Sequence, residues 1–373
     1  MRRSREIIHI RFRKRCASHL LGVLALLFRV WRAITSRERK HVLVLEPFGL
    51  GDAISHEPLL RALARSGYSV TFCTRPEWRA AFAEFELVEV AAPWGRHAKG
   101  EKYKLADYAG PQFRELLQRM RAPGKDAIGI DTRGDVRSVL LLYAAGCKRV
   151  ISLKTYLGTD LQMLTGSATL VPFDPSLRRW ELNLRFLNPM GIPATDVEPP
   201  SIPRIQSGLK SGRRVALNPI APWKGKWWPN QNWITLIPQL EERGYEVTVL
   251  CGPGQSNVIE TELGDVAPVT QCSSVSNWIE QLQKCSALVT VDSGPMHLAD
   301  ALRVPVIALF GQGALPLWAP SGAQSCVITH RDSDDFDLRN PSEENTDYAQ
   351  GFMRRISVDE VLAAVERIIG SSR

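Results

Sequence analysis

The sequence of 373 residues contains no Cys-x-x-Cys pair. Its seven cysteines are scattered singly, at positions 16, 73, 147, 251, 272, 285 and 326. This spacing excludes a zinc cage of paired cysteines and a closely spaced disulfide framework. The odd number of cysteines is typical of a protein that stays in a reducing compartment such as the cytoplasm.

The part of the chain after residue 40 has no excess of basic residues, although the net charge of the whole sequence is +8. Residues 1–40 contain 12 Lys or Arg against two acidic residues, which gives this arm a net charge of +10. The remaining 35 basic and 37 acidic side chains leave the rest of the chain at about −2. Nucleic-acid binding would need a basic surface on the folded part, so no nucleic-acid partner is predicted.

The apolar run Leu20–Phe28 is too short to cross a bilayer, because it has nine residues where a spanning helix needs about 20. A secretory signal is disfavoured, since Arg29 and Arg32 follow the run where a small-residue cleavage site belongs. Read as a helix, the arm has Leu, Val, Phe and Trp side chains on one face. The opposite face has arginines and small residues, at positions 11, 15, 18, 22, 25, 29 and 32. Such a helix lies in the interface of an anionic membrane, with its arginines at the headgroups. Residues 1–36 are therefore predicted to bind an anionic membrane surface; the alternatives are an extension packed on the folded body or a start codon assigned too early.

The length predicts two domains, because one ordinary core does not extend over so many residues. From residue 41, short apolar runs alternate with amphipathic helical stretches, which is typical of doubly wound α/β domains. A proline-rich stretch at 189–203 marks the linker. We predict a basic amphipathic arm at 1–40, one Rossmann-like domain at 41–203 and a second at 204–373 that closes with a helix. Ser357, with Glu360 three residues on, predicts a capping box at the start of that helix. Within the first domain, a strand is predicted at 41–46, a helix at 53–66, and a region of helix and loop at 137–192.

Doubly wound domains carry their functional loops at the carboxyl ends of the strands. The first such loop contains Gly49, Gly51 and Asp52, between a buried strand and a helix. It resembles the start of a dinucleotide fingerprint, but Ile54 stands where the third glycine belongs, which argues against NAD. Asp52 suits a general base that takes a proton from a sugar hydroxyl, and it equally suits a helix cap.

A second loop, Asp292–His297, follows the apolar strand 287–291 and opens a helix. Ser293 or Gly294 is predicted to cap that helix, and Pro295 suits its first turn. Free backbone N–H groups and the positive end of the helix dipole make such a turn an anion site, suited to a diphosphate. Asp292 is placed to hold a sugar hydroxyl. His297 lies one turn into the helix, where a half-buried structural histidine is the simpler interpretation.

A third cluster runs from Asn218-Pro219 to Trp223-Lys224-Gly225-Lys226-Trp227-Trp228-Pro229. Lys226 stands just before a predicted helix, between a glycine and two tryptophans. A cation there fits the stabilisation of a leaving phosphate, and the alternative is a surface aromatic loop.

Taken together and in this order, the three clusters resemble glycosyltransferase family 9, the lipopolysaccharide heptosyltransferases. Gly51-Asp52 followed by Pro58–Leu63 resembles the opening motif of the family. Lys226-Trp227-Trp228-Pro229 is similar to its K-x-W-P motif, and Asp292–Ala299 is similar to its D-[ST]-G-x-x-H-x-[AT] motif. The resemblance extends over about residues 41–370 and leaves the arm outside.

The resemblance implies a GT-B fold, in which two Rossmann-like doubly wound α/β domains face a central cleft. It implies that the first domain binds the acceptor and that the second binds a nucleotide sugar. The implied reaction is an inverting, metal-independent transfer of heptose from ADP-heptose to a lipopolysaccharide core or a related surface glycan. The implied roles are a general base for Asp52, a phosphate ligand for Lys226, a sugar contact for Asp292, diphosphate contacts for Ser293 and Gly294, support of that loop for His297, and an acceptor-side loop for Gly49 and Gly51.

The same resemblance implies no cofactor, no metal, and two small-molecule partners, the nucleotide sugar donor and a lipid-linked glycan acceptor. With the arm, it places the protein in the cytoplasm, peripherally on the cytoplasmic face of the bacterial inner membrane. Gln255 and Asn257 stand where heptosyltransferases can hold the ribose with an acid, so transfer from another nucleotide sugar stays an alternative. An epimerase of the same fold, or a binding protein with decayed chemistry, are further alternatives. Asp332-Ser333-Asp334 matches a metal signature of the other glycosyltransferase fold, but its polar setting favours a solvated turn.

Overall fold

The computed structural model describes residues 22–31, 34, 39–90, 110–154, 166–203, 212–311, 315–330 and 346–370. Contacts divide the chain into two compact units. The first unit takes its residues from 1–48, 56–174 and 180–197, and the second from 49–55, 175–179 and 198–373. The short segment Gly49–Ser55 therefore belongs to the second unit, although it follows the first strand of the first unit.

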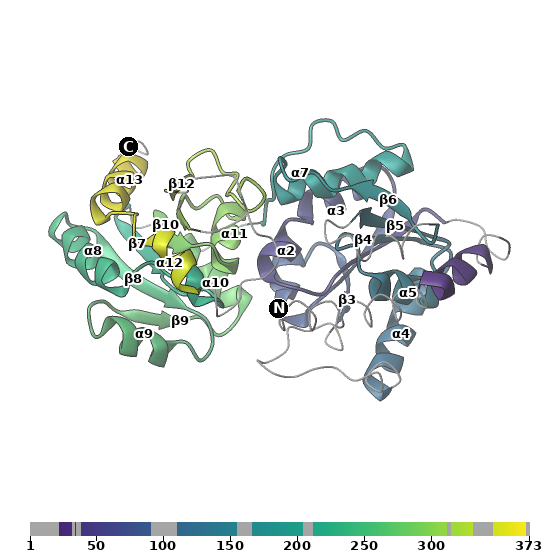
Figure 1. Ribbon diagram of the computed structural model, residues 1–373, viewed down its shortest axis with the longest axis horizontal. Coiled ribbons are helices and arrows are strands. Elements are labelled where there is room, and N and C mark those ends of the chain that lie inside the picture. The colour runs from purple at the N-terminus through teal and green to yellow at the C-terminus, as the bar shows by residue number, and fades with distance from the viewer. Residues whose placement is uncertain are drawn as a thin grey trace, which may run out of the picture. The chain divides into compact units, whose positions relative to one another are not determined.

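The first unit is built on a six-stranded sheet in the order β3-β2-β1-β4-β5-β6, with every neighbouring pair parallel (Figure 1). Its strands are β1 (His41–Glu46), β2 (Ser69–Thr74), β3 (Glu86–Glu89), β4 (Ile128–Asp131), β5 (Arg149–Lys154) and β6 (Thr169–Pro172). The connecting helices are α3 (Glu57–Arg65), η1 (Pro76–Phe82), α4 (Pro111–Gly124) and α5 (Val136–Ala144), and α7 (Arg179–Leu184) and η3 (Arg185–Met190) follow β6.

The second unit is built on another six-stranded parallel sheet, in the order β12-β11-β10-β7-β8-β9. Its strands are β7 (Arg214–Asn218), β8 (Glu246–Cys251), β9 (Val269–Gln271), β10 (Ala287–Val291), β11 (Val306–Phe310) and β12 (Cys326–Thr329). Its helices are α2 (Leu50–Ile54), η4 (Lys224–Lys226), α8 (Asn230–Glu242), α9 (Ser256–Leu263), α10 (Val275–Gln283), α11 (Gly294–Ala301), α12 (Thr346–Met353) and α13 (Val358–Gly370).

Both sheets have the strand order of a doubly wound fold. Counted from the first strand of each unit, the order is 3-2-1-4-5-6 in both. The growth of each sheet therefore reverses beside its first strand, between β1 and β4 in the first unit and between β7 and β10 in the second. Ligands of such folds bind outside the carboxyl ends of the strands at this switch point. The prediction of two doubly wound α/β domains is confirmed.

Strands β10 and β11 of the second sheet are buried along their whole length. Every residue of Ala287–Val291 and of Val306–Phe310 is buried, and all but Thr290 are apolar. Nearly continuous apolar runs of this kind are typical of parallel strands that helices cover on both faces. A sheet anchored in this way gives the loops at its carboxyl edge a fixed base.

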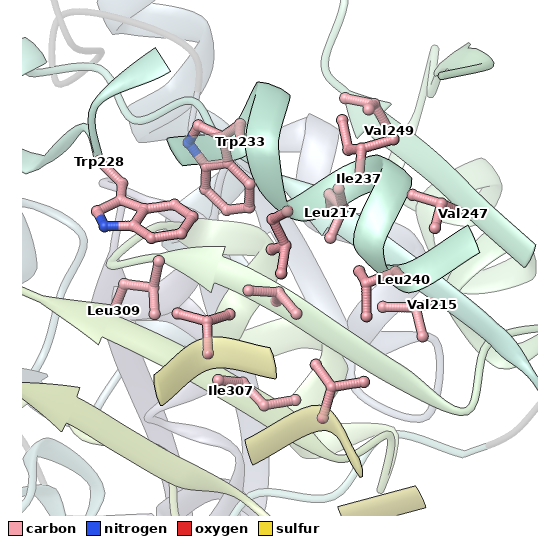
Figure 2. Close-up of a cluster of buried hydrophobic side chains, with 14 of the residues drawn as sticks. Val215, Leu217, Trp228, Trp233, Ile237, Leu240, Val247, Val249, Ile307 and Leu309 are labelled. Carbon is pink, nitrogen blue, oxygen red and sulfur yellow. The ribbon is translucent and has the colours of Figure 1, made fainter. Parts of the chain in front are cut away.

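The core of the second unit surrounds two perpendicular tryptophans. Trp228 precedes α8 and Trp233 lies within it; their ring centroids are 5.0 Å apart and their planes meet at 89° (Figure 2). Both are buried together with apolar residues of β7, β8, β10, β11 and α13. An edge-to-face pair of this kind contributes about 1 kcal/mol beyond its buried area. Trp228 thereby ties the loop before α8 to the core.

Two parts of the sequence prediction for the first half were wrong in detail. The helix predicted at 53–66 is broken into α2 and α3, with His56 as the amino-terminal cap of α3 and Pro58 in its first turn. Proline has no N–H to bond back into α2, which explains the break. The region 137–192, predicted as helix and loop, also contains the strands β5 and β6. β5 pairs with β4 and β6 pairs with β5, and these contacts between distant segments were not visible in the short sequence patterns of the two strands.

The arm contains a helix at residues 22–31, called the arm helix below, which belongs to the first unit. Its small residues Gly22 and Ala25 are buried, and Ala25 joins the apolar core of that unit. Arg29 donates a hydrogen bond to the carbonyl of Gly166. The small-residue face therefore packs on the body, whereas the sequence interpretation placed this face at lipid headgroups. No helix among the described residues is long and apolar enough to cross a membrane.

Candidate active site

The switch point of the second sheet brings two of the three sequence clusters together. Strand β7 ends at Asn218, and its neighbour β10 is followed by Asp292 and Ser293. The register pairs Thr290 with Asn218, so the loops after both strands start side by side at the same edge. This is the position at which doubly wound folds bind their ligands.

A buried hydrogen-bond network fixes the start of the loop after β10. The Ser293 hydroxyl donates to Asn218 Oδ1 at 3.0 Å, and the Thr290 hydroxyl lies 3.2 Å from the same oxygen. Asn218 Nδ2 in turn donates to the carbonyl of Leu250, in β8, at 3.0 Å. The Ser293 hydroxyl thus holds the loop in place. The side chain is engaged within the protein, so the backbone of the loop is the part left to contact a ligand. Sequence reasoning noted Asn218 but missed this role; the available signal was an Asn at the end of one strand and a Ser two residues after its neighbour.

The helix that follows has the form of an anion site. Ser293 is the amino-terminal cap of α11, its side chain makes no cap bond, and Pro295 lies in the first turn. The first N–H groups of a helix have no partner within the helix and carry the positive end of its dipole. The predicted start of the helix at Ser293 or Gly294 is confirmed. A Cβ on Gly294 would meet Leu50 Cβ at 3.3 Å, so a glycine is the residue that lets α2 approach here.

Lys226, from the third cluster, lies against the same loop. Its ammonium nitrogen is 2.5 Å from Asp292 Oδ2. The Lys226 side chain is 30% exposed, whereas that of Asp292 is 8% exposed. The Lys226 ammonium group is thus partly exposed to solvent and accessible to a ligand. The buried Asp292 carboxylate holds it at the carboxyl end of β10. A diphosphate at the start of α11 would compete with Asp292 for this ammonium group.

The first cluster joins the site through the packing of α2 on α11. Both helices belong to the second unit. The contact between them is so close that a Cβ on Gly51 would lie 2.3 Å from Cδ2 of the His297 ring. Gly51 therefore gives α2 its approach to α11, and Asp52 is carried on the same short helix. Asp52, Lys226 and Asp292 all contribute to the electrostatic environment of His297.

His297 is a half-buried packing group in this arrangement, as the sequence suggested. Burial lowers the pKa of His297 from its ordinary value, against the opposing effect of the carboxylates of Asp292, Asp300 and Asp52. On its other side the ring meets Trp318 edge to face, with centroids 5.7 Å apart. A neutral imidazole held between two helices and an indole fits a support for the α11 loop.

Asp52 lies inside α2 and is not its cap residue. The amino-terminal cap of α2 is Gly49, which makes no side-chain cap bond, and Asp52 is the acidic residue of the first turn. A carboxylate in the first turn benefits from the helix dipole. The placement puts Asp52 on the helix that contacts α11, next to the site residues.

Replacing Gly51 by Ala is expected to lower both stability and activity. The added methyl group would overlap the His297 ring, which Trp318 contacts on its other side, and overpacking of this kind costs about 1–3 kcal/mol. If α2 shifts to relieve the overlap, Asp52 moves with it, and a displacement of about 1 Å costs about 100-fold in rate. Thermal unfolding and kcat/KM measure the two effects.

A second replacement, His297→Ala, should restore part of the stability of Gly51→Ala. The matched control is Gly212→Ala, where an added Cβ has no atom within 4 Å. An unchanged melting temperature for Gly51→Ala would show that this helix contact is not tight.

The switch point of the first sheet also carries a buried polar cluster, which sequence reasoning missed. Glu46, at the end of β1, accepts a hydrogen bond from the Phe48 N–H at 3.0 Å, and its other oxygen lies 3.5 Å from the Thr132 hydroxyl. His56 Nε2 lies 2.7 Å from the same hydroxyl and 3.9 Å from Glu46. The cluster fixes the backbone turn that precedes Gly49. The signal was a glutamate at the end of an otherwise apolar strand.

Asp131, at the end of β4, is buried beside this cluster. Its carboxylate accepts hydrogen bonds from the Ser152 hydroxyl and from the N–H groups of Arg133 and Asp135. Burial raises the pKa of Asp131 to about 7, against the effect of these bonds. The group therefore shapes the turn after β4 in the first unit.

Among the described residues, no group of three or more His, Cys, Asp or Glu side chains is arranged to hold a metal ion. The cysteines that the structure describes are free, and five of the six are buried. Asp332, Ser333 and Asp334 lie outside the described residues.

Comparison with known proteins identifies the family of the chain. The family model described as glycosyltransferase family 9 (heptosyltransferase) matches residues 113–345. The chain belongs to glycosyltransferase family 9. It is 27% identical over 209 residues to lipopolysaccharide heptosyltransferase 3 of Escherichia coli, which covers 52% of this chain and 60% of that protein. The matches to the first curated family members thus span about half of their length, 46% and 60%.

Solved structures of family 9 share the fold over nearly their whole length. The glycosyltransferase family 9 structure from Veillonella parvula has a TM-score of 0.72 at 18% identity and covers 90% of this chain and 99% of its own. The ADP-heptose lipopolysaccharide heptosyltransferase II of E. coli has a TM-score of 0.65 at 18% identity and covers 89% and 99%. A dodecameric glycosyltransferase of E. coli described as iron-containing, TibC, has a TM-score of 0.56. At these identities the likeness shows the fold alone.

Proposed function

We propose that the chain is an inverting, metal-independent glycosyltransferase that moves heptose from ADP-heptose to a lipopolysaccharide core or a related glycan. The observation that carries the proposal is the set of groups gathered in the second unit. Lys226 and Asp292 lie at the switch point, α11 starts beside them, and α2 brings Asp52 against α11. Membership of family 9 and the name of the E. coli relative support heptose as the sugar.

The proposed chemistry is a single displacement at the anomeric carbon. Asp52 takes the proton of the acceptor hydroxyl, and the hydroxyl oxygen forms a bond to the anomeric carbon as the bond to the diphosphate oxygen breaks. The electron pair of that bond leaves with the diphosphate. Because attack and departure lie on opposite faces of the sugar, the anomeric configuration inverts.

The charge that develops on the diphosphate is neutralised by the second unit itself. The ammonium group of Lys226 and the amino terminus of α11 supply positive charge fixed before the reaction, which is the most effective kind of electrostatic catalysis. Asp292 is paired with Lys226 in this structure. Once the phosphate binds the ammonium group, the Asp292 carboxylate is placed to accept a hydrogen bond from a sugar hydroxyl. The backbone at Ser293 and Gly294 contacts the diphosphate, and Gly49 and Gly51 belong to the loop on the acceptor side.

A transfer assay with ADP-heptose and core-truncated lipopolysaccharide tests this function, with and without EDTA. We expect full turnover in EDTA, because Lys226 and α11 meet the charge of the leaving group without a metal. The anomeric configuration of the product, measured by NMR, should be opposite to that of the donor. A strict requirement for a divalent metal, or a product of retained configuration, would rule out this mechanism.

We further propose that residues 1–36 bind the protein to an anionic membrane, which places it in the cytoplasm against the inner membrane, where a lipid-linked acceptor is found. The arm helix exposes a set of large apolar side chains: Val23, Leu24, Leu26, Leu27, Phe28, Val30 and Trp31, with Ile34 just beyond. Among the described residues, the only other exposed large hydrophobics are Val258 and Tyr348. The sequence around this apolar surface supplies the arm's net charge of +10. Apolar side chains beside many arginines support binding to anionic lipid.

Deleting residues 1–36 is expected to abolish binding to anionic vesicles without unfolding the protein. The deleted segment contributes Ala25 to the apolar core, so a small loss of stability is expected. Co-sedimentation with vesicles of anionic and of zwitterionic lipid measures the binding, and Leu27→Asp with Trp31→Asp is a variant of full length that keeps every arginine. Equal vesicle binding by the truncated and the complete protein would defeat the arm hypothesis.

A further inference from the structure

The turn that carries Lys226 is too short to be rigid by itself. η4 has only three residues, Lys224–Lys226, and its internal hydrogen bond runs from the Lys226 N–H to the Trp223 carbonyl at 3.1 Å. Short 3₁₀ turns have poor hydrogen-bond geometry and take their stability from what packs on them. The position of the Lys226 ammonium group therefore depends on groups outside the turn.

Helix α12, which is distant in sequence, packs on this turn. The indole N–H of Trp223 donates to the Thr346 hydroxyl at 3.2 Å. The side-chain amide of Gln350 donates to the carbonyl of Lys224 at 3.1 Å. These two bonds come from successive turns of one face of α12 and hold both ends of the Trp223–Lys224 step.

The same face of α12 is anchored at the carboxyl edge of the sheet. A Cβ on Gly311, directly after β11, would lie 2.8 Å from Met353 Sδ and 3.3 Å from the Ala349 carbonyl. Met353 and Ala349 are fully buried. The face of α12 that carries Thr346 and Gln350 is therefore held against the sheet through Ala349 and Met353.

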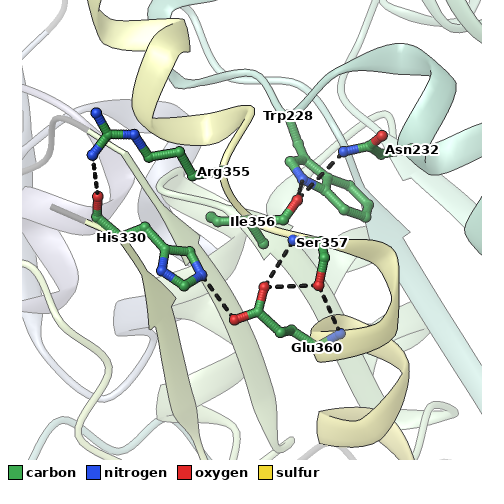
Figure 3. Close-up of polar contacts among 7 residues, drawn as sticks. All are labelled: Trp228, Asn232, His330, Arg355, Ile356, Ser357 and Glu360. Carbon is green, nitrogen blue, oxygen red and sulfur yellow. Dashed lines mark hydrogen bonds and ion pairs between the residues drawn. The ribbon is translucent and has the colours of Figure 1, made fainter.

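The chain after α12 holds the far end of the lysine turn. The indole N–H of Trp228, two residues beyond Lys226, donates to the Ile356 carbonyl at 2.9 Å (Figure 3). The next residue, Ser357, forms a reciprocal capping box with Glu360, which starts α13 as its sequence predicts. His330, at the end of β12, contacts Glu360 at 2.8 Å, so the Ile356 carbonyl has a fixed place.

We infer that Thr346, Gln350 and Ile356 are positioning residues for Lys226; the segment 346–357 that carries them is called the carboxy-terminal brace. The brace sets where the ammonium group meets the leaving phosphate without touching the donor. This role rests on the proposed function of Lys226 as the diphosphate ligand. The key contacts are the Thr346 hydroxyl on Trp223, the Gln350 amide on the Lys224 carbonyl, and the Ile356 carbonyl on Trp228.

A double-mutant cycle on the full-length protein tests the brace. We expect Thr346→Val combined with Gln350→Ala to raise the dissociation constant of ADP roughly three- to tenfold, the effect of losing one or two hydrogen bonds. In a Lys226→Ala background the same pair should change ADP affinity by less than about twofold, because its effect passes through the lysine. Titration calorimetry gives the affinities, and steady-state transfer should show a lower kcat/KM with the same pattern.

Two controls separate positioning from loss of folding. Thr346→Ser keeps a hydroxyl for Trp223 and should keep the affinity of the unaltered protein. Asp347→Asn changes a side chain that is 98% exposed on the same helix and should have no effect. If Thr346→Val/Gln350→Ala weakens ADP equally with and without Lys226, or leaves affinity unchanged while Lys226→Ala weakens it, the brace does not act through the lysine. If Lys226→Ala itself leaves ADP affinity unchanged, the proposed function of Lys226 fails before the brace is tested.

Discussion

Replacing Asp52 by Asn is expected to reduce kcat for sugar transfer by at least about 100-fold while leaving donor affinity within about twofold. Asparagine has the size of aspartate and retains its place in the first turn of α2, but it cannot accept the proton of the attacking hydroxyl. A positioned general base contributes about 10²–10⁴ to a rate. Asp52 is not the cap residue of α2, and asparagine keeps a side-chain oxygen at the same place in the first turn. Initial rates of transfer and calorimetric titration with ADP measure the two quantities.

The folding of this variant is checked by its melting temperature, with Asp347→Asn as a surface replacement of the same chemistry. The base hypothesis predicts normal melting, normal ADP affinity and lost turnover. If donor binding collapses and residual turnover survives, Asp52 is a structural element of α2. The two outcomes differ in which quantity changes, so either one settles the role.

Replacing Lys226 by Ala is expected to weaken ADP binding about 10- to 100-fold, which is the range for a charge-assisted hydrogen bond. Turnover should fall further than affinity, because the ammonium group meets charge that grows as the diphosphate leaves. The substitution also leaves Asp292 without its partner, at 8% exposure, and an unpaired buried carboxylate destabilises the fold.

This second effect is removed by making Asp292→Asn in the same chain. Lys226→Met is a useful companion variant, because it retains the apolar stem in the turn and loses only the charge. Titration with ADP and with AMP separates phosphate contacts from contacts to the nucleoside. An unchanged dissociation constant for ADP in both lysine variants would remove Lys226 from the donor site.

The local parts of the site were predictable from the sequence because each depends on neighbours in the chain. The buried strand at 287–291, followed by a cap residue and a proline, predicts a helix start and an anion site, and the structure has that start at Ser293. The strand at 41–46 and the capping box at Ser357 follow in the same way from local pattern. The family motifs are such local patterns, which explains why the resemblance was visible.

The contacts between distant segments could not be predicted, because chain order does not show which surfaces meet. The grouping of Gly49–Ser55 with the second unit depends on the close approach of Gly51 to His297. The hydrogen bond from Ser293 to Asn218 joins residues 75 positions apart, and the one from Trp228 to Ile356 joins residues 128 apart. A glycine or a tryptophan in a motif indicates that something packs there, and only the structure says what.

The face of the arm helix that meets the body illustrates the same limit. Helical periodicity correctly separated a small-residue face from an apolar face. It could not say which of the two faces packs on protein, and the burial of Gly22 and Ala25 gives the answer. Small residues allow close packing between a helix and a protein surface, so the apolar face is the one left exposed.

The central claim is that the second unit binds a nucleotide sugar through its diphosphate, and a calorimetric screen of the purified protein against ADP-, UDP-, GDP- and dTDP-sugars in EDTA tests it most directly. The account predicts saturable binding of one donor per chain, with ADP-heptose the strongest, and loss of that binding in Lys226→Met. Binding of none of the four classes, or binding that Lys226→Met leaves unchanged, would contradict it.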